Sequence, residues 1–381
     1  MILGYTKEKL ASKSAIKTAE EIFHQPNMWE ETFQIVKKSS EIQSLVNQYL
    51  IDKDATIVFA GAGSSEFVGN IAKAIVTQYA KCKVLSIPTT DIITNLGNYS
   101  KSEEKTLMIS FGRSGSSPES IGAIDVANKF YDSVVHLAIT CNKDGDLSNY
   151  AKSNKNGFSV VLPDKTNDLG FAMTSSFTSM LLAAILLFNK KISLDEIKGL
   201  NELTQSLLDN NYSDIEKIVK EFDFERIVYI GSGDIREVGK EANLKMLELT
   251  RGEVVGIYDS CLGFRHGPKS FLNKKTLVVV FMSNNENVNK YEVDLINEIV
   301  KENKHGQLLV ADSSGGISLV KTNTEMMNIN KSINSDLVAM YYTVVGQLLS
   351  FYGSIDRNIT TDNPFPEGNL NRVVHGVKMH Y

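Results

Sequence analysis

Apolar residues follow two alternating spacings along this chain, one typical of helices and one typical of buried strands. Residues 7–50 place apolar side chains at helical spacing among Glu, Lys and Gln, which predicts a leading helical segment. From residue 55 onward, short apolar runs such as ATIVFAG and KTLMISF alternate with helical stretches. Strands that alternate with helices are typical of a parallel sheet covered on both faces, so the pattern predicts an α/β fold.

The same order of elements occurs twice. The sequence IVFAGAGSS at 57–65 resembles IVYIGSGDI at 227–235, and each reads as a strand, a glycine turn and the start of a helix. An internal duplication of this kind indicates two related α/β units, with either two similar ligand crevices or one composite site. The predicted segments are an N-terminal helical segment, two α/β domains and a C-terminal tail, at 1–50, 51–195, 215–360 and 361–381. The tail is rich in turn formers, and we expect it to be irregular or to close over a site.

Composition and charge narrow the class of protein. Of 381 residues, 42% are hydrophobic and 22% are charged, as in ordinary globular proteins, and the net charge of -5 gives no general attraction to nucleic acid or acidic lipid. The longest apolar run, 180–188, is too short to span a membrane, and the N-terminus lacks the apolar core of a signal peptide. The three cysteines form no CxxC pair, which is typical of reduced thiols. We therefore expect a cytoplasmic protein with neither nucleic-acid nor membrane partners.

The first glycine turn is a candidate phosphate site. Gly63, Ser64 and Ser65 lie between a strand and a helix, where backbone N–H groups can point at an anion and the serine hydroxyls can donate further hydrogen bonds. A dinucleotide-binding loop would need a third glycine where Glu66 stands, and no GK[ST] of a P-loop follows any glycine turn. Small residues also serve purely structural turns, so this loop alone leaves both interpretations open.

A second loop of the same kind strengthens the phosphate hypothesis. Arg113, Ser114, Ser116 and Ser117 follow another strand and precede another helix, and a tight turn does not require so many polar side chains. Ligands of doubly wound sheets bind outside the carboxyl ends of the strands, where both loops lie. Together the loops predict a pocket for one phosphate ester, with serine hydroxyls and helix N-termini in place of a metal.

Candidate acid–base residues lie in the second α/β unit. Glu241, Lys245 and Glu248 share one helix face, a pattern that most often forms a solvated salt-bridge stripe. Glu248 lies within MLEL, whose apolar residues could desolvate the carboxylate and raise its pKa towards that of a general base. His266 lies in GFRHGP, a turn that could hold the imidazole for ring opening of a sugar. The six histidines show no ligand spacing, so we expect neither a metal nor a cofactor.

These motifs resemble a known family. Similarity to the tandem sugar isomerase (SIS) domains in the isomerase half of glucosamine-6-phosphate synthase rests on GAGSS, SFGRSGSSPES, KMLEL and FRHGP. Similarity to the bacterial galactosamine-6-phosphate deaminase/isomerase group, also named tagatose-6-phosphate ketose/aldose isomerases, rests further on DLGFAMTSSFTSMLL, GFRHGPKSF and NRVVHGV. The resemblance implies two tandem SIS domains, each a parallel sheet between helices in a three-layer arrangement.

The resemblance also implies roles for individual residues. The phosphate-binding hydroxyls of the family fall on Ser64, Ser65, Ser114 and Ser117. Glu248 matches the base that moves a proton between C1 and C2, and Lys245 matches the lysine one turn before it. His266 matches a ring-opening histidine that the neighbouring subunit supplies, which implies a homodimer or homotetramer with shared active sites. Arg372 stands where the synthase has a C-terminal lysine, so the resemblance implies a catalytic position that is occupied here by a different cation.

The expected activity is a deaminating isomerisation. The resemblance implies conversion of D-galactosamine 6-phosphate to D-tagatose 6-phosphate and ammonia in amino sugar catabolism. One alternative is a ketose/aldose isomerase that uses the same base without deamination. A second alternative is a sugar-phosphate sensor without turnover, against which stands the presence of both Glu248 and His266 in one chain.

Overall fold

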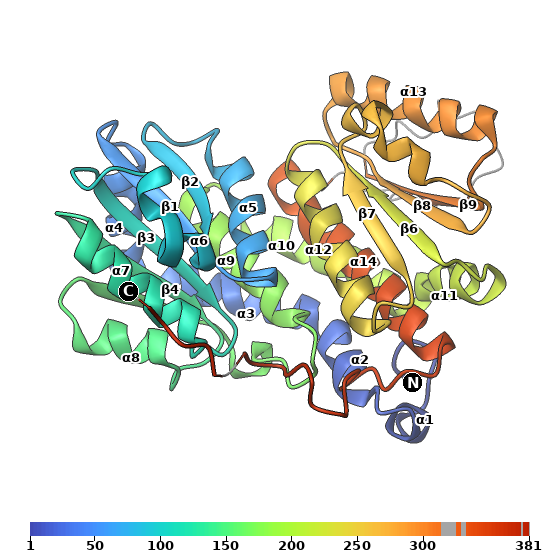
Figure 1. Cartoon of the computed structure of the whole chain (residues 1–381), viewed down its shortest axis with the longest axis horizontal. Helices are drawn as coiled ribbons and strands as arrows, with labels where there is room; N and C mark the ends of the chain where they lie inside the picture. The colour runs from blue at the N-terminus through green and yellow to red at the C-terminus, as the bar shows by residue number, and fades with distance from the viewer. Residues whose placement is uncertain (314–324, 329–332, 375, 381) are drawn as a thin grey trace. The chain divides into compact units, whose positions relative to one another are not determined.

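The chain folds into two compact units. The computed structural model describes residues 1–313, the backbone of 325–328, and residues 333–374 and 376–380. The first-sheet unit comprises His24–Lys198 and Pro366–Tyr381, and the second-sheet unit comprises Met1–Phe23 and Gly199–Phe365 (Figure 1). Each unit therefore includes residues from both halves of the chain. The domain boundaries given above stay a prediction.

The leading segment is helical, but it is divided into four helices. They are α1 (Lys7–Ser12), α2 (Ile16–Phe23), α3 (Gln25–Lys38) and α4 (Ser40–Leu50). Ser14 adopts a positive φ of 46° between α1 and α2, and Ser39 has a ψ of 56° between α3 and α4. Pro26 lies at the start of α3, where its missing N–H costs no helical hydrogen bond. These backbone breaks interrupt what the apolar spacing predicts as one segment.

The first sheet contains five parallel strands in the order β2-β1-β3-β4-β5. The strands are β1 (Ala55–Gly61), β2 (Lys83–Pro88), β3 (Lys105–Gly112), β4 (Val134–Thr140) and β5 (Gly157–Val161). The helices are α5 (Ser64–Val76), α6 (Thr89–Asn95), α7 (Pro118–Phe130), α8 (Asp146–Ser153) and α9 (Ser175–Phe188).

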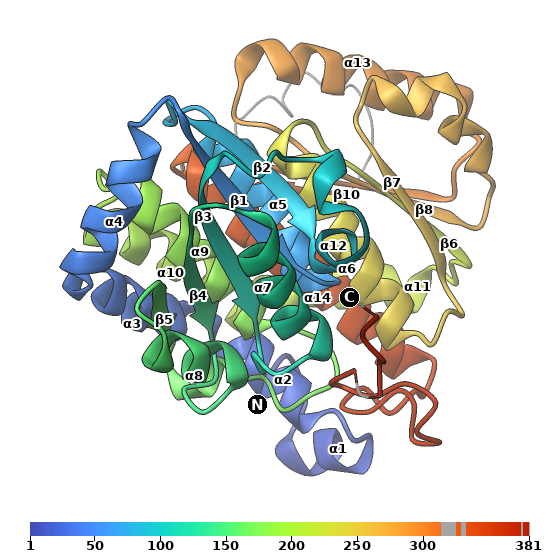
Figure 2. The same ribbon diagram turned by 60° about the vertical axis from the view of Figure 1, so that its left-hand side comes forward.

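Helices cover both faces of this sheet (Figure 2). On one face, Val58 and Met108 belong to the same buried cluster as Ile92 of α6 and Ala123 of α7. On the other face, Phe59 packs its ring against Phe111 and against Phe188 of α9. Every residue of α9 is buried, so this apolar helix is a core element of its unit.

The second sheet repeats this arrangement with the order β10-β9-β8-β6-β7, again fully parallel. Its strands are β6 (Arg226–Ile230), β7 (Val255–Asp259), β8 (Thr276–Phe281), β9 (Gln307–Asp312) and β10 (Glu325–Asn328). Helix α10 (Leu194–Ser206) continues through a π-helical turn, Leu207–Asn211, into α11 (Tyr212–Glu221). The remaining helices are α12 (Asp234–Leu249), α13 (Glu286–Glu302) and α14 (Val338–Asp356).

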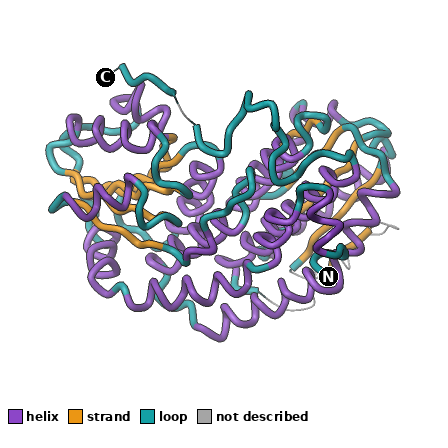
Figure 3. The backbone as a smooth tube through the Cα atoms, turned by 90° about the horizontal axis from the view of Figure 1, so that it is seen from below, coloured by secondary structure: helices purple, strands orange, loops and turns teal. Residues whose placement is uncertain are grey.

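Helices also cover both faces of the second sheet. Val228 and Val278 pack with Ile296 of α13 on one face. On the other face, Phe281 stacks on Tyr342 of α14, with 5.1 Å between the ring centroids. In Figure 3, which colours helices purple and strands orange, helices lie on both sides of the strands in each unit.

The two units share one topology. Read from its other edge, the second sheet has the order β7-β6-β8-β9-β10. In both sheets, therefore, the first strand of the unit lies between the second and the third, and the fourth and fifth follow. The turn after the first strand is also repeated, because Gly63 and Gly233 both precede a helix with nearly the same dihedral angles, φ 56° and ψ -129° against φ 62° and ψ -126°. A side chain at either position would be strained. The predicted α/β class, with two parallel sheets between helices, is confirmed.

Candidate active site

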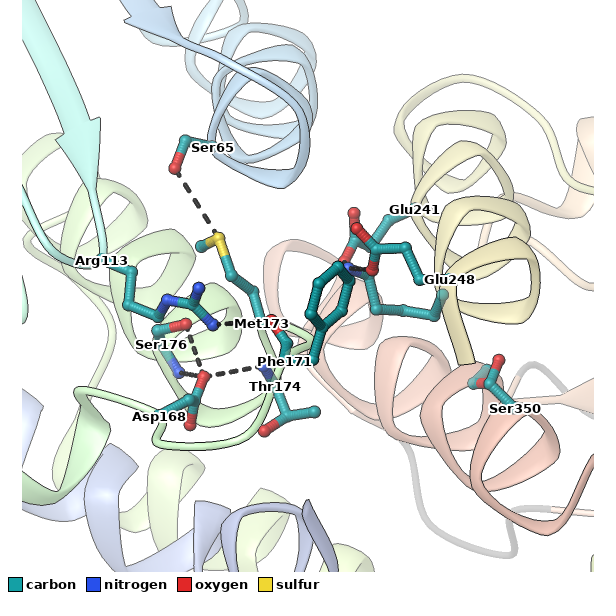
Figure 4. A network of polar contacts seen from close by, with 12 residues as sticks. Ser65, Arg113, Asp168, Phe171, Met173, Thr174, Ser176, Glu241, Glu248 and Ser350 are labelled. Carbon is teal, nitrogen blue, oxygen red and sulfur yellow. Dashed lines mark hydrogen bonds and ion pairs between the residues drawn. The ribbon is translucent and has the colours of Figure 1, made fainter. Parts of the chain in front are cut away.

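The first predicted phosphate loop lies at the carboxyl end of β1. A Cβ on Gly61 would come within 2.4 Å of the Ser65 backbone, so glycine is required for α5 to start this close to the strand. Ser64 and Ser65 form the first turn of α5 and are buried. The Ser65 hydroxyl donates to the Met173 sulfur at 3.9 Å, a weak bond that a phosphate oxygen would readily replace (Figure 4). The loop has the geometry of an anion site at a helix N-terminus.

Each predicted serine of the second loop takes part in capping or in turn formation. Ser117 is the N-cap of α7 and accepts from the Ser120 amide. The Ser116 hydroxyl accepts from the Asp146 amide at the start of α8, 3.1 Å away, and Ser114 accepts from the Ser116 amide at 3.4 Å. A serine hydroxyl that accepts a hydrogen bond can still donate its own proton. These local contacts therefore orient the serines without preventing hydrogen bonds to a phosphate.

Arg113 makes hydrogen bonds to backbone carbonyls. Its guanidinium donates to the carbonyls of Gly170 at 3.3 Å, Phe171 at 3.1 Å and Arg372 at 2.7 Å, and the side chain is buried. Arg113 thereby joins the loop after β3 to the segment before α9 and to the C-terminal tail. This geometry assigns it a structural part, and its role in phosphate binding stays a prediction.

Arg372 lies in the first-sheet unit together with the serine loops, whereas Lys245 and Glu248 belong to the second-sheet unit. Its guanidinium donates to the Asn167 side-chain oxygen at 3.0 Å, and its backbone carbonyl accepts a hydrogen bond from the Arg113 guanidinium. These contacts fix the tail within this unit without regular secondary structure. A contact of Arg372 with substrate stays a prediction.

Asp168 lies at the start of the motif DLGFAMTSSFTSMLL and is a functional residue that the sequence motifs do not single out. Asp168 is fully buried, and one carboxylate oxygen accepts from the Thr174 amide at 2.8 Å, the Ser176 amide at 2.9 Å and the Ser176 hydroxyl at 2.5 Å (Figure 4). It thus caps the N-terminus of α9 from outside the helix. The sequence does contain a signal for this cap, because an Asp stands a few residues before the Thr-Ser-Ser with which the helix begins.

In the second-sheet unit, three charged residues of α12 form one ion set. The Lys245 ammonium pairs with the Glu248 carboxylate and lies 3.6 Å from Glu241. The Lys245 and Glu241 side chains are each 1% exposed, while Glu248 is 25% exposed. Figure 4 shows Glu241 and Glu248 on the same helix. The three residues predicted to share a face therefore do so. A buried lysine between two carboxylates holds the partly exposed Glu248 in a defined position, suited to proton transfer.

The surroundings of Glu248 differ from the predicted apolar pocket. Met246 and Leu249 are buried in the core, but Leu247 is 46% exposed, and the group that contacts the carboxylate is the ammonium of Lys245. On a helix, adjacent residues point in different directions, so apolar neighbours in sequence need not surround a side chain.

His266 ends a short 3₁₀ turn, Gly263–His266, and its side chain is exposed. The following Gly267 has a φ of 128°, which favours glycine. No hydrogen bond fixes the imidazole within the described ranges. The backbone of the turn is instead held by its neighbours: Arg265 pairs with Glu298 of α13 at 2.8 Å, and Lys269 pairs with both Glu298 and Glu302.

We expect Glu298→Gln to lower kcat by about tenfold, because it weakens the attachment of the His266 turn to α13. Lys269 and Arg265 hold the pKa of Glu298 below its usual range, so the carboxylate is charged at neutral pH. Steady-state kinetics provide the measurement. Glu302→Gln, which removes a partner of Lys269 and of Lys304 but leaves Arg265 paired with Glu298, is the matched control with a smaller effect. An unchanged kcat for Glu298→Gln would contradict this positioning role.

Within the part of the chain that the structure describes, no group of three or more His, Cys, Asp or Glu side chains could hold a metal ion. The same described residues include no helix long and apolar enough to cross a membrane. Cys82, Cys141 and Cys261 are free thiols.

Comparison with known proteins defines the class. The chain belongs to the SIS-domain family, whose domain profile matches residues 49–190 and again residues 222–355. Over 378 residues it is 35% identical to the D-galactosamine-6-phosphate deaminase AgaS of Shewanella sp. strain ANA-3, a match that covers 98% of this chain and 94% of that protein.

Solved structures similar to this chain belong to the same class of protein. The tagatose-6-phosphate ketose/aldose isomerase of Escherichia coli is 32% identical with a TM-score of 0.85, covering 96% of each chain. A Clostridium novyi NT protein, described as a candidate tagatose-6-phosphate ketose/aldose isomerase, is 37% identical with a TM-score of 0.92, covering 100% of this chain and 99% of that one. These relatives confirm the prediction that the chain is an enzyme of the sugar-phosphate isomerase and deaminase class.

Proposed function

We propose that this enzyme converts D-galactosamine 6-phosphate and water to D-tagatose 6-phosphate and ammonia. The observation that carries the proposal is the full-length similarity to a D-galactosamine-6-phosphate deaminase. The ion set of Glu241, Lys245 and Glu248 supports it, because deamination through C2 needs a positioned base.

The phosphate end of the substrate is held, in this proposal, by the two serine loops of the first-sheet unit. Gly63, Ser64 and Ser65 offer backbone and hydroxyl donors at the start of α5, and Ser114, Ser116 and Ser117 do so before α7. A phosphate dianion is stabilised there by helix N-termini and hydroxyl donors, so binding of the phosphate needs no metal.

The chemical step is a proton transfer between neighbouring carbons. His266 assists opening of the sugar ring to the free aldehyde, and Glu248 removes the proton from C2, which gives an amino-enolate. Lys245 or Arg372 stabilises the negative charge that develops on O1. Protonation of C1 by Glu248, with transfer of one amino proton to O1, gives a C2 imine with a hydroxymethyl group at C1. Water adds to the imine carbon and ammonia leaves, which gives the ketone of tagatose 6-phosphate.

Ammonia release from purified protein tests this proposal. With galactosamine 6-phosphate we expect one ammonia for each tagatose 6-phosphate formed, measured in parallel. Glucosamine 6-phosphate serves as the matched substrate that differs only at C4. Absence of ammonia from every 2-amino-2-deoxyhexose 6-phosphate would overturn the proposal.

An isomerase without deamination is the second candidate. The printed name of the similar Escherichia coli structure favours it, and the same base and phosphate loops would serve. Only the substituent at C2 differs between the two reactions. Formation of tagatose 6-phosphate from an aldose 6-phosphate, with no ammonia from amino sugars, would select this candidate. The expected cytoplasmic location and the homo-oligomer with shared active sites stay predictions.

We expect Ser65→Ala to raise KM about tenfold or more with a smaller change in kcat, because it removes a hydroxyl donor to the charged phosphate. Steady-state kinetics and competitive inhibition by inorganic phosphate both report this loss. Ser232→Ala, in the corresponding loop after β6, is the matched control and should leave KM unchanged. Equal KM values for Ser65→Ala and the wild-type enzyme would argue against phosphate binding at this loop.

A further inference from the structure

The duplicated units place two corresponding pairs of loops at the carboxyl ends of their central strands. In the first-sheet unit these loops follow β1 and β3, and in the second-sheet unit they follow β6 and β8. In both sheets the strand order reverses between these two parallel strands, because the chain adds its second strand on one side of the first and its third strand on the other side. Doubly wound sheets bind ligands at such a point. The second-sheet unit therefore has the backbone of a second anion site.

A carboxylate of the chain itself contacts the loop after β8 and lies near the loop after β6 in the second-sheet unit. Glu292 of α13 is fully buried, and its Oε2 accepts from the Ser283 amide, in the loop after β8, at 3.0 Å. The same oxygen accepts from the Asn289 side chain at 3.1 Å. Ser232, in the loop after β6, lies close enough to lower the pKa of this carboxylate, while its hydroxyl donates to the Cys261 sulfur at 3.4 Å. These are the kinds of donors that a phosphate oxygen would use.

Burial raises the pKa of Glu292, and the hydrogen bonds from Ser283, Asn289 and Ser232 oppose this rise. The other carboxylate oxygen, Oε1, is buried without a hydrogen-bond partner among the described residues. An acidic side chain is rarely buried unless its surroundings favour it. The Ser283 amide and the Asn289 side chain are therefore donors that an anion could use, and a carboxylate of the chain already accepts from both.

The corresponding residue of the first-sheet unit is apolar. Glu292 stands seven positions after the N-cap Asn285, and the residue at that distance from the N-cap Ser117 of α7 is Ile124. The first helical residue also differs, since Ser64 of α5 corresponds to Asp234 of α12. Burial, together with the nearby charge of Asp336, raises the pKa of Asp234 to about 6, so this group is mostly ionised at neutral pH and repels a bound anion.

We propose that Glu292 is an internal substitute for phosphate, which closes the second-sheet unit to sugar phosphates and limits each chain to one phosphate-binding site. The proposal rests on the proposed function only in assigning that one site to the serine loops of the first-sheet unit. The Glu292 carboxylate also holds the loop after β8 through the Ser283 amide. The second crevice that the duplication could provide is thereby occupied.

Equilibrium dialysis with radiolabelled inorganic phosphate tests this proposal by counting sites per chain. We expect one site in the wild-type protein and none in Ser65→Asp, whose new carboxylate occupies the first loop. Glu292→Ala removes the internal anion and should bind a second phosphate, whereas Glu292→Gln, which keeps the volume, should retain one. Thermal unfolding gives a parallel readout, because phosphate should raise the Tm of Glu292→Ala more than that of Glu292→Gln.

Two results would overturn the proposal: a site that remains in Ser65→Asp, or a folded Glu292→Ala that binds no second phosphate. Recovery of Glu292→Ala only in phosphate buffer would support it. If Glu292→Ala cannot be recovered in any buffer, the number of phosphate sites in Ser65→Asp decides the question. No phosphate site in that variant supports the proposal, and one site overturns it. The ammonia assay is independent of this count, so failure of the proposed activity is distinguishable from failure of the internal substitute.

Discussion

Glu248→Gln is expected to lower kcat by about a thousandfold or more while the Kd for galactosamine 6-phosphate changes little. The amide keeps the shape of the side chain but cannot accept the C2 proton. Lys245 keeps its partner Glu241, so the ion set loses one member without leaving the buried ammonium unpaired. Stopped-assay kinetics give kcat, and calorimetric titration gives Kd.

The control for this variant is Glu253→Gln, an exposed residue just beyond the end of α12. It should retain wild-type turnover. The result also separates the enzyme from a sugar-phosphate sensor, since a sensor would bind equally well with either residue and show no turnover at the outset. Turnover of Glu248→Gln at more than about a tenth of the wild-type rate would remove Glu248 from the mechanism.

Asp168→Ala should destabilise the first-sheet unit by about 4 kcal/mol, because it removes a buried carboxylate that accepts three hydrogen bonds at the start of α9. Asp168→Asn keeps the volume and should cost less, since the amide oxygen retains part of these bonds. Urea unfolding followed by circular dichroism measures the change, and a two-unit chain can show it in one of two transitions.

Asp164→Ala is the matched control, because Asp164 lies four residues earlier and is exposed. It should change the free energy of unfolding by less than about 0.5 kcal/mol. A loss below about 1 kcal/mol for Asp168→Ala would show that the backbone amides of α9 find other acceptors and that Asp168 is not the capping group.

The fold could be predicted well where the chain is buried on both sides. Central strands β1, β3, β6 and β8 are continuous apolar runs, and their burial is nearly complete. The edge strands β5, β7 and β10 were not predicted, because edge positions tolerate polar and exposed residues, as Gly157–Val161 and Val255–Asp259 illustrate. Such strands form through pairing with a neighbour rather than through their own pattern.

The candidate site could be predicted in part. The spacing of Glu241, Lys245 and Glu248 was sufficient to place them on one face of α12, because that depends only on local helix geometry. The partners of Arg113 could not be predicted, since Gly170, Phe171 and Arg372 are distant in sequence. Contacts of this kind follow from the tertiary fold.

The discontinuous composition of the two units has a consequence for synthesis on the ribosome. The first-sheet unit includes residues from Pro366 onward. Among them is Arg372, whose backbone carbonyl accepts a hydrogen bond from Arg113. Asp362 likewise accepts from the Thr18 amide at 2.8 Å and caps the early helix α2. Neither unit can therefore complete these contacts before residues 362–372 emerge, so the first-sheet unit cannot finish folding before the second-sheet unit is synthesised.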